Sequence, residues 1–164
     1  IYENPGVLPR FFLVGHVRRA ANMAEALATL RARDFDVRAE AVVEAPVELS
    51  GTAPAGSVRV LEYGAQKFAL ETDASAPAFL VTSETAYPGW HAWVDDREFA
   101  PVMTDAAFRG LPVPAGKHVV KMRFNPEILW RAACVTVAAG VALVLAVWFG
   151  DNRQARAPWT SKTN

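Results

Sequence analysis

The sequence contains a single cysteine, Cys134, and no excess of either charge, because 17 acidic residues balance 17 lysines and arginines. One cysteine cannot form a disulfide within the chain. Zero net charge, with the charges spread along the chain, leaves no basic surface of the kind that nucleic-acid binding requires. We therefore expect no nucleic-acid partner.

Few residues in the chain suggest a metal or a cofactor. The three histidines, His16, His91 and His118, are too far apart in sequence to indicate a metal site by ligand spacing. No glycine-rich loop matches a phosphate-binding or dinucleotide-binding pattern. We predict no metal-binding residue, no cofactor-binding residue and no cofactor.

Catalytic carboxylates are equally scarce. Glu84, Asp95 and Asp96 lie near aromatic residues, and a glycosidase would use two carboxylates across a sugar ring. Adjacent aspartates are more typical of a turn, however, and Glu84 falls at the end of a predicted strand. We predict no catalytic residue, and we do not expect the chain to be an enzyme.

The most informative segment is a long apolar run near the C-terminal end, from Ala132 to Gly150, without a charge or a proline. As a helix it would be about 28 Å long, close to the thickness of the hydrocarbon core of a bilayer. Trp130 and Trp148 lie near its two ends, where aromatic rings prefer the membrane interface, and Arg131 can extend to the headgroups. The pattern predicts one transmembrane helix at 128–150, in contact with the lipid bilayer, followed by a polar tail at 151–164.

Small side chains form one face of this predicted helix. Ala138 and Ala142 are four residues apart and share a face with Cys134. Small residues at this spacing let a second helix approach closely within lipid. These three residues are the candidates for packing against an integral membrane protein complex.

The segment before the helix, residues 1–127, shows the patterns of β structure. Ala78–Ser83 is a short apolar run, as in a strand buried on both faces. Tyr87-Pro88-Gly89-Trp90 has the residues of a type II turn, and the alternation that begins at Trp90 is that of a strand. A second alternating strand follows the turn at Pro114-Ala115-Gly116. We interpret 78–125 as a β-meander in which 97–102 is one strand.

One short helix is predicted inside the β domain. Asn22 is a favourable N-cap with Glu25 three residues later, and Met23, Leu27 and Leu30 form an apolar stripe. We expect the helix to run over 23–32 and to pack through this stripe, with arginines in its last turn. The fold class is therefore mainly β: an antiparallel β sandwich with one short packed helix, followed by a single C-terminal transmembrane helix.

Several short segments occur in an order that resembles the C-terminal portion of the bacterial YfhO-type membrane proteins, which are multi-pass and glycosyltransferase-C-like. These segments are Tyr2-Glu3-Asn4-Pro5, Leu8-Pro9-Arg10, Asp34-Phe35-Asp36, Ser83-Glu84-Thr85, Tyr87-Pro88-Gly89-Trp90, Val94-Asp95, Phe108-Arg109 and Val113-Pro114-Ala115-Gly116. The resemblance implies an extracytoplasmic β domain and a last transmembrane helix. It implies no catalytic residue in this chain, because the acidic residues of such enzymes lie in an early loop that the chain does not include.

Three functions are compatible with these patterns. We favour a non-catalytic accessory subunit in the bacterial inner membrane, single-pass with its β domain on the periplasmic side, bound to a larger membrane complex. Respiratory and photosynthetic assemblies carry such subunits, which is an analogy of architecture only. The alternatives are a detached C-terminal part of a YfhO-like glycosyltransferase that acts with a multi-pass partner, and a module that binds carbohydrate or an envelope polymer. Basic residues flank the helix on both sides, so charge does not decide the orientation.

Overall fold

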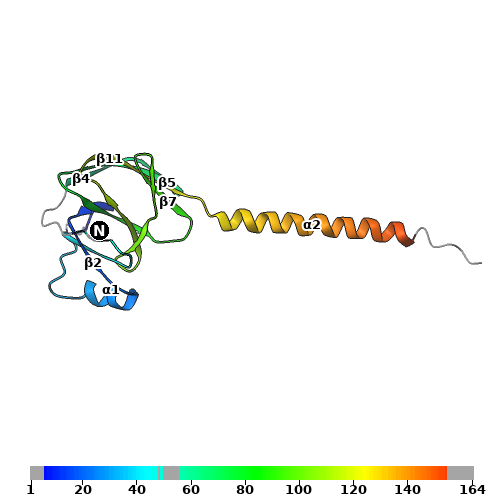
Figure 1. Cartoon of the computed structure of the whole chain (residues 1–164), viewed down its shortest axis with the longest axis horizontal. Helices are drawn as coiled ribbons and strands as arrows, with labels where there is room; N and C mark the ends of the chain where they lie inside the picture. Colours follow the sequence, from blue (N-terminus) through cyan, green and yellow to red (C-terminus); the bar gives the residue numbers. More distant parts are fainter. Residues whose placement is uncertain (1–5, 48, 50–55, 155–164) are drawn as a thin grey trace, which may run out of the picture. The chain divides into compact units, whose positions relative to one another are not determined.

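The computed structural model describes residues 6–47, 49 and 56–154, and it divides the chain into two compact units between Asn125 and Pro126. Figure 1 shows the first unit as β structure with one short helix and the second as the long helix α2. Two segments named above, Tyr2-Glu3-Asn4-Pro5 and the part of the tail after Gln154, lie outside the described residues.

The first unit contains a six-stranded sheet in the order β1-β6-β10-β9-β3-β2. Neighbouring strands are antiparallel except β2 and β3, which are parallel. The strands are β1 (Phe11–Val14), β2 (His16–Arg19), β3 (Glu40–Val43), β6 (Ala78–Thr85), β9 (Val102–Thr104) and β10 (Phe108–Val113).

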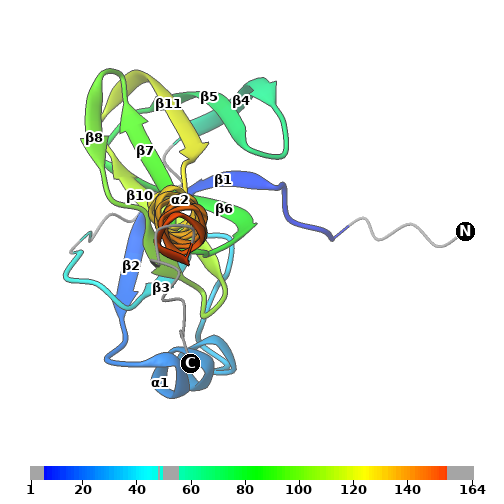
Figure 2. The same cartoon turned by 90° about the vertical axis from the view of Figure 1, so that its right-hand side faces the viewer.

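A five-stranded antiparallel sheet completes the sandwich, in the order β4-β5-β11-β7-β8. Its strands are β4 (Gly56–Tyr63), β5 (Lys67–Ala74), β7 (Trp90–Val94), β8 (Arg97–Phe99) and β11 (Gly116–Phe124). Figure 2 shows this sheet in the upper part of the view, with the other sheet below it and α1 beneath. The predicted sandwich is confirmed.

The main core lies between the two sheets and follows from the two-residue period of the strands. Along β11, Val120 and Met122 are buried while Lys121 and Arg123 are exposed, as the alternation predicts. Buried side chains from both sheets meet here, among them Leu70, Leu80, Leu111, Val120 and Met122. Complete burial of a side chain of this size stabilises the fold by about 1.5–3 kcal/mol.

The six-stranded sheet is also covered on its outer face, which explains the uninterrupted apolar run of β6. Leu80 points into the main core, whereas its neighbours Phe79 and Val81 pack in a second cluster with Val14 and Val43. Residues 78–82 are therefore all buried, and the prediction of a strand buried on both faces is confirmed.

The short helix α1 (Met23–Leu30) begins where the sequence predicts and ends earlier. The side chain of Asn22 accepts a hydrogen bond from Glu25 N at 3.0 Å, and Glu25 reaches back to Ala21 N at 2.8 Å. The helix ends at Leu30 with Arg31 as its C-cap. The prediction that arginines lie in its last turn is therefore wrong.

The predicted packing stripe of α1 is wrong as well. Ala26 is the buried residue of the helix, and it contacts Val42 and Ala20 with Leu30 at the edge of the cluster. Met23 and Leu27 are 50% and 38% exposed. The small Ala26 side chain lets the helix backbone approach the sheet, which turns the larger residues outward.

The stretch 78–125 is not a simple meander. Consecutive strands pair as β7 with β8 and β9 with β10, and the chain crosses from one sheet to the other after β6, β8 and β10. The segment 97–102, predicted as one strand, is divided at Ala100-Pro101 between β8 and β9, which belong to different sheets.

The second unit contains α2 (Glu127–Gln154), in which Trp130–Trp148 is long and apolar enough to cross a membrane by length and composition. The described part of this stretch has no buried residue. Residues 151–154, predicted as part of the polar tail, continue the helix.

Candidate functional site

The turn at Tyr87-Pro88-Gly89-Trp90 lies beside the most unusual polar side chain of the β domain. Gly89 has φ 102°, a left-handed conformation that glycine adopts without strain. Its carbonyl accepts a hydrogen bond from Asn125 N at 2.6 Å, which ties the turn to the end of β11. Tyr87 is 66% exposed, and Trp90 is half-buried as the first residue of β7.

The unusual side chain is Arg109, a charged residue of β10 that is only 3% exposed. Its guanidinium carbon lies 3.6 Å from the centroid of the Trp90 ring, a close cation–π contact. Its nearest counter-charge in the described part of the chain is Glu84, with Nη2 3.7 Å from Oε2. Burial lowers the pKa of Arg109, since the charged form is deprived of water.

Two nitrogens of Arg109 are unsatisfied. Nε and Nη1 are both buried and have no hydrogen-bond acceptor among the described residues. A buried donor without a partner costs about 1–3 kcal/mol, and more when the group is charged. The arrangement is therefore one that stability alone does not favour.

Two hollows meet at this arginine, and both are lined by Tyr87, Trp90 and Arg109. The first, which we name the Arg109 hollow, has a volume of about 260 Å³ and is also lined by Ala86, Pro88, Gly89, Pro101, Val102 and Met103. The second has about 360 Å³ and adds Ala65, Glu84, Thr85 and Phe124. The lining is mainly apolar with a few polar groups, which is the usual character of a small-molecule site.

Aromatic side chains continue from the hollow across one end of the sandwich. Adjacent rings have centroids between 5.1 and 6.4 Å apart. The rings belong to Tyr63, Phe11, Phe68, Trp90, Phe124 and Tyr87. Such a series supplies apolar surface that holds the guanidinium and the turn in place.

Glu84 connects the hollow to a second arginine. The hydroxyl of Tyr63 donates to Glu84 Oε1 at 2.8 Å, and Arg10 Nη1 lies 3.5 Å from the same oxygen and donates to Tyr63. The hydrogen bond to Glu84 raises the pKa of Tyr63 because it favours the neutral phenol. One carboxylate thus stands between two arginines, Arg10 and Arg109, and the local charge is positive.

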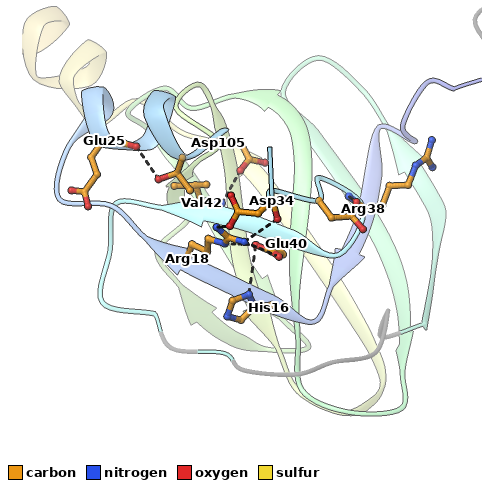
Figure 3. Close-up of polar contacts among 10 residues, drawn as sticks. His16, Arg18, Glu25, Asp34, Arg38, Glu40, Val42 and Asp105 are labelled. Carbon is orange, nitrogen blue, oxygen red and sulfur yellow. Dashed lines mark hydrogen bonds and ion pairs between the residues drawn. The ribbon is translucent and has the colours of Figure 1, made fainter. Parts of the chain in front are cut away.

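A separate polar cluster joins β2 and β3 to the segment after α1 (Figure 3). Arg18 forms ion pairs with Glu40 and with Asp34, the latter at 3.0 Å, and His16 lies 3.7 Å from Glu40. These contacts raise the pKa of Arg18 and lower that of Asp34. The charges of this cluster are paired with one another, so its role is to fasten the α1–β3 connection.

The remaining carboxylates near aromatic residues also make structural contacts. Asp95 accepts from Val119 N at 2.9 Å and lies 2.8 Å from His118 Nδ1. Asp96 is exposed and lies 4.0 Å from Lys121. Among the described residues, no group of three or more histidines, cysteines, aspartates and glutamates is placed to hold a metal ion.

The residues proposed for the membrane segment all lie on α2. Cys134, Ala138 and Ala142 are exposed along it, and Trp130 and Trp148 are 70% and 59% exposed at the ends of its apolar stretch. Arg131 follows Trp130 at the start of that stretch. The structure thus brings the turn residues 87–90 together with Arg109, whereas the helix residues form a site of their own.

Arg109 is the residue that sequence reasoning missed. In the sequence it belongs to Phe108-Arg109, one of the segments that carry the family resemblance. The available signal was a charged residue inside an otherwise apolar strand, FRGLPV, since a lone charge in such a strand must be buried or turned outward.

The fold and these two sites define a class of protein: a β-sandwich domain followed by one helix that is able to cross a membrane. Comparisons with family models, with curated proteins and with solved structures found no match.

Proposed function

We propose that this chain is a non-catalytic, single-pass membrane subunit that binds a larger bacterial membrane protein complex through α2 and its β domain. The observation that carries the proposal is the surface of α2. The stretch Trp130–Trp148 has a mean hydropathy of 2.0 and no buried residue in its described part. A helix that is apolar on all sides is stable in lipid or against other helices, and not in water.

One face of this helix suits close packing against another helix. Cys134, Ala138 and Ala142 lie along it, and all three side chains are exposed. Small side chains allow two backbones to approach, and van der Waals contact then drives association within the bilayer. Binding by the β domain at the membrane surface would add to the affinity through effective concentration.

The proposed location is the bacterial inner membrane, with the β domain on the periplasmic side and 151–164 in the cytoplasm. Its support is the resemblance to the YfhO-type proteins, whose C-terminal β domain is extracytoplasmic. A non-catalytic role is supported by the contacts of the carboxylates. Asp95 and Glu84 are each held by hydrogen bonds and ion pairs to neighbouring side chains and backbone.

Two other functions have specific support. The ordered set of shared segments favours a detached C-terminal part of a YfhO-like glycosyltransferase that acts with a multi-pass partner. The aromatic lining of the Arg109 hollow, with Tyr87 exposed beside Trp90, favours a module that binds carbohydrate or an envelope polymer.

Co-purification in mild detergent tests the holding role. The variant Ala138→Leu with Ala142→Leu fills the small face, and we expect it to release the chain from its complex while the β domain remains folded. Ala132→Leu with Ala139→Leu is the matched control, because it adds the same volume on a face about 100° away. If the first variant stays bound, or if the control releases the chain equally, the proposed helix contact is wrong.

A further inference from the structure

We propose that the Arg109 hollow binds an oxyanion, a carboxylate or a phosphate, carried by a small soluble molecule or by a lipid headgroup. This inference is independent of the holding role proposed for α2. It rests on an arginine that is buried without enough partners, on the charge around it and on the shape of the space beside it.

The guanidinium of Arg109 is buried and lacks hydrogen-bond acceptors among the described residues. Arg109 is 97% buried, yet two of its three nitrogens have no acceptor among the described residues. A buried charge is normally satisfied by several hydrogen bonds, because otherwise its desolvation is not repaid. An oxyanion bound in the hollow would accept from the unsatisfied guanidinium and so complete the site.

The charge around Arg109 is positive. Glu84 lies 3.7 Å from Arg109 and 3.5 Å from Arg10, so one negative charge is shared by two positive ones. Tyr63 also donates to Glu84, which disperses the negative charge further. The surroundings therefore attract an anion and disfavour a cation.

The hollow is small and has apolar walls beside Arg109. The volume of about 260 Å³ lies just below the usual range of ligand pockets, about 300–1,000 Å³, so only a small group fits. Trp90, Val102 and Met103 offer apolar surface to such a group. Nε and Nη1 are buried, so a ligand that reaches them must move a neighbouring side chain. Trp90, which stacks on the guanidinium at 3.6 Å, is the side chain in closest reach of that movement.

The experiment monitors the environment of the Trp90 side chain by ¹⁹F NMR. The full chain is labelled with 5-fluorotryptophan, and the ¹⁹F signal of Trp90 is assigned by its loss in Trp90→Phe. In neutral detergent micelles we titrate glucuronate, inorganic phosphate and, as the uncharged control, glucose. In lipid nanodiscs we vary the fraction of phosphatidylglycerol, which presents the same phosphate chemistry on a lipid headgroup.

We expect a saturable shift of the Trp90 signal with the anions and none with glucose. A shift with glucuronate or phosphate in micelles identifies a soluble ligand, and a shift with phosphatidylglycerol alone identifies a lipid headgroup. Arg109→Met should weaken binding at least tenfold. Arg59→Met, which removes an exposed arginine paired with Glu71, should leave binding unchanged.

Arg109→Lys is the second variant, and circular dichroism reports the folding of both. Lysine keeps the charge but loses the planar guanidinium that stacks on Trp90, so binding should weaken severalfold in a folded protein. The proposal is overturned if no anion shifts the Trp90 signal, if glucose shifts it equally, or if a folded Arg109 variant binds as the wild type does.

Discussion

His118 Nδ1 lies 2.8 Å from Asp95 Oδ2, and this contact joins the turn between β7 and β8 to β11. The other oxygen of Asp95 accepts a hydrogen bond from Val119 N at 2.9 Å. Asp95 itself has φ 55°, a left-handed conformation that aspartate tolerates better than most residues. A turn without glycine is therefore held in shape by the side chain of its first residue.

The contact predicts linked titrations of the two residues. The backbone hydrogen bond from Val119 and the bond from His118 lower the pKa of Asp95, while Asp95 raises the pKa of His118. The histidine contributes stability that is complete below its ordinary pKa of 6.5 and is lost as the pH rises through its folded pKa. The aspartate contributes stability that is complete above 3.8 and is lost as the pH falls through its folded pKa.

Titration of His118 by NMR checks this contact. We expect a pKa above 6.5 in the wild type and a fall toward 6.5 in Asp95→Asn. Asp96→Asn is the control, because the neighbouring Asp96 is exposed and pairs only weakly with Lys121. An unchanged His118 pKa in Asp95→Asn, or an equal fall in the control, would contradict the assignment.

Asp105 gives a second prediction, on stability. Its Oδ1 accepts from Val42 N and its own N donates to Val42 O, both at 2.8 Å, so the turn between β9 and β10 is bonded to β3. Burial raises the pKa of Asp105, and the hydrogen bond from Val42 opposes this only in part. The charged form of Asp105 therefore destabilises the folded protein at neutral pH.

Asp105→Asn keeps the acceptor, removes the charge and tolerates φ 50°. We expect its free energy of unfolding at pH 7 to equal or exceed that of the wild type, and the gain to disappear as acid protonates Asp105 in the wild type. Asp105→Ala should lose about 1–3 kcal/mol, because it leaves Val42 N unsatisfied. Denaturant unfolding measures the free energy of unfolding of both variants. An Asp105→Asn variant as unstable as Asp105→Ala would contradict this prediction.

Local periodicity predicted the parts of the fold that depend on one strand at a time. The alternation of Val120 and Met122 with Lys121 and Arg123 follows directly from the pleat, and it appears in the structure. The positive φ of Gly89 follows from the turn residues in the same way.

Features that depend on contacts between distant segments were not predicted. The division of 97–102 between two sheets depends on which strand each half pairs with: β8 pairs with β7, and β9 pairs with β10 and β3. The exposure of Met23 and Leu27 depends on how closely Ala26 approaches Val42. The stack of Arg109 on Trp90 joins residues 19 positions apart, and no local pattern encodes it.

We propose that α2 crosses the membrane once, with the β domain on the outer side. Cysteine labelling in intact cells tests it most directly. In a Cys134→Ala background, a single cysteine replaces either Ser57, which is exposed on β4, or Ser161, which lies outside the described residues. A membrane-impermeant thiol reagent should label the first variant in intact cells and the second only after the membrane is disrupted. Labelling of Ser161→Cys alone in intact cells would show that the orientation is the opposite one. Labelling of both variants or of neither would contradict a single crossing with an outer β domain.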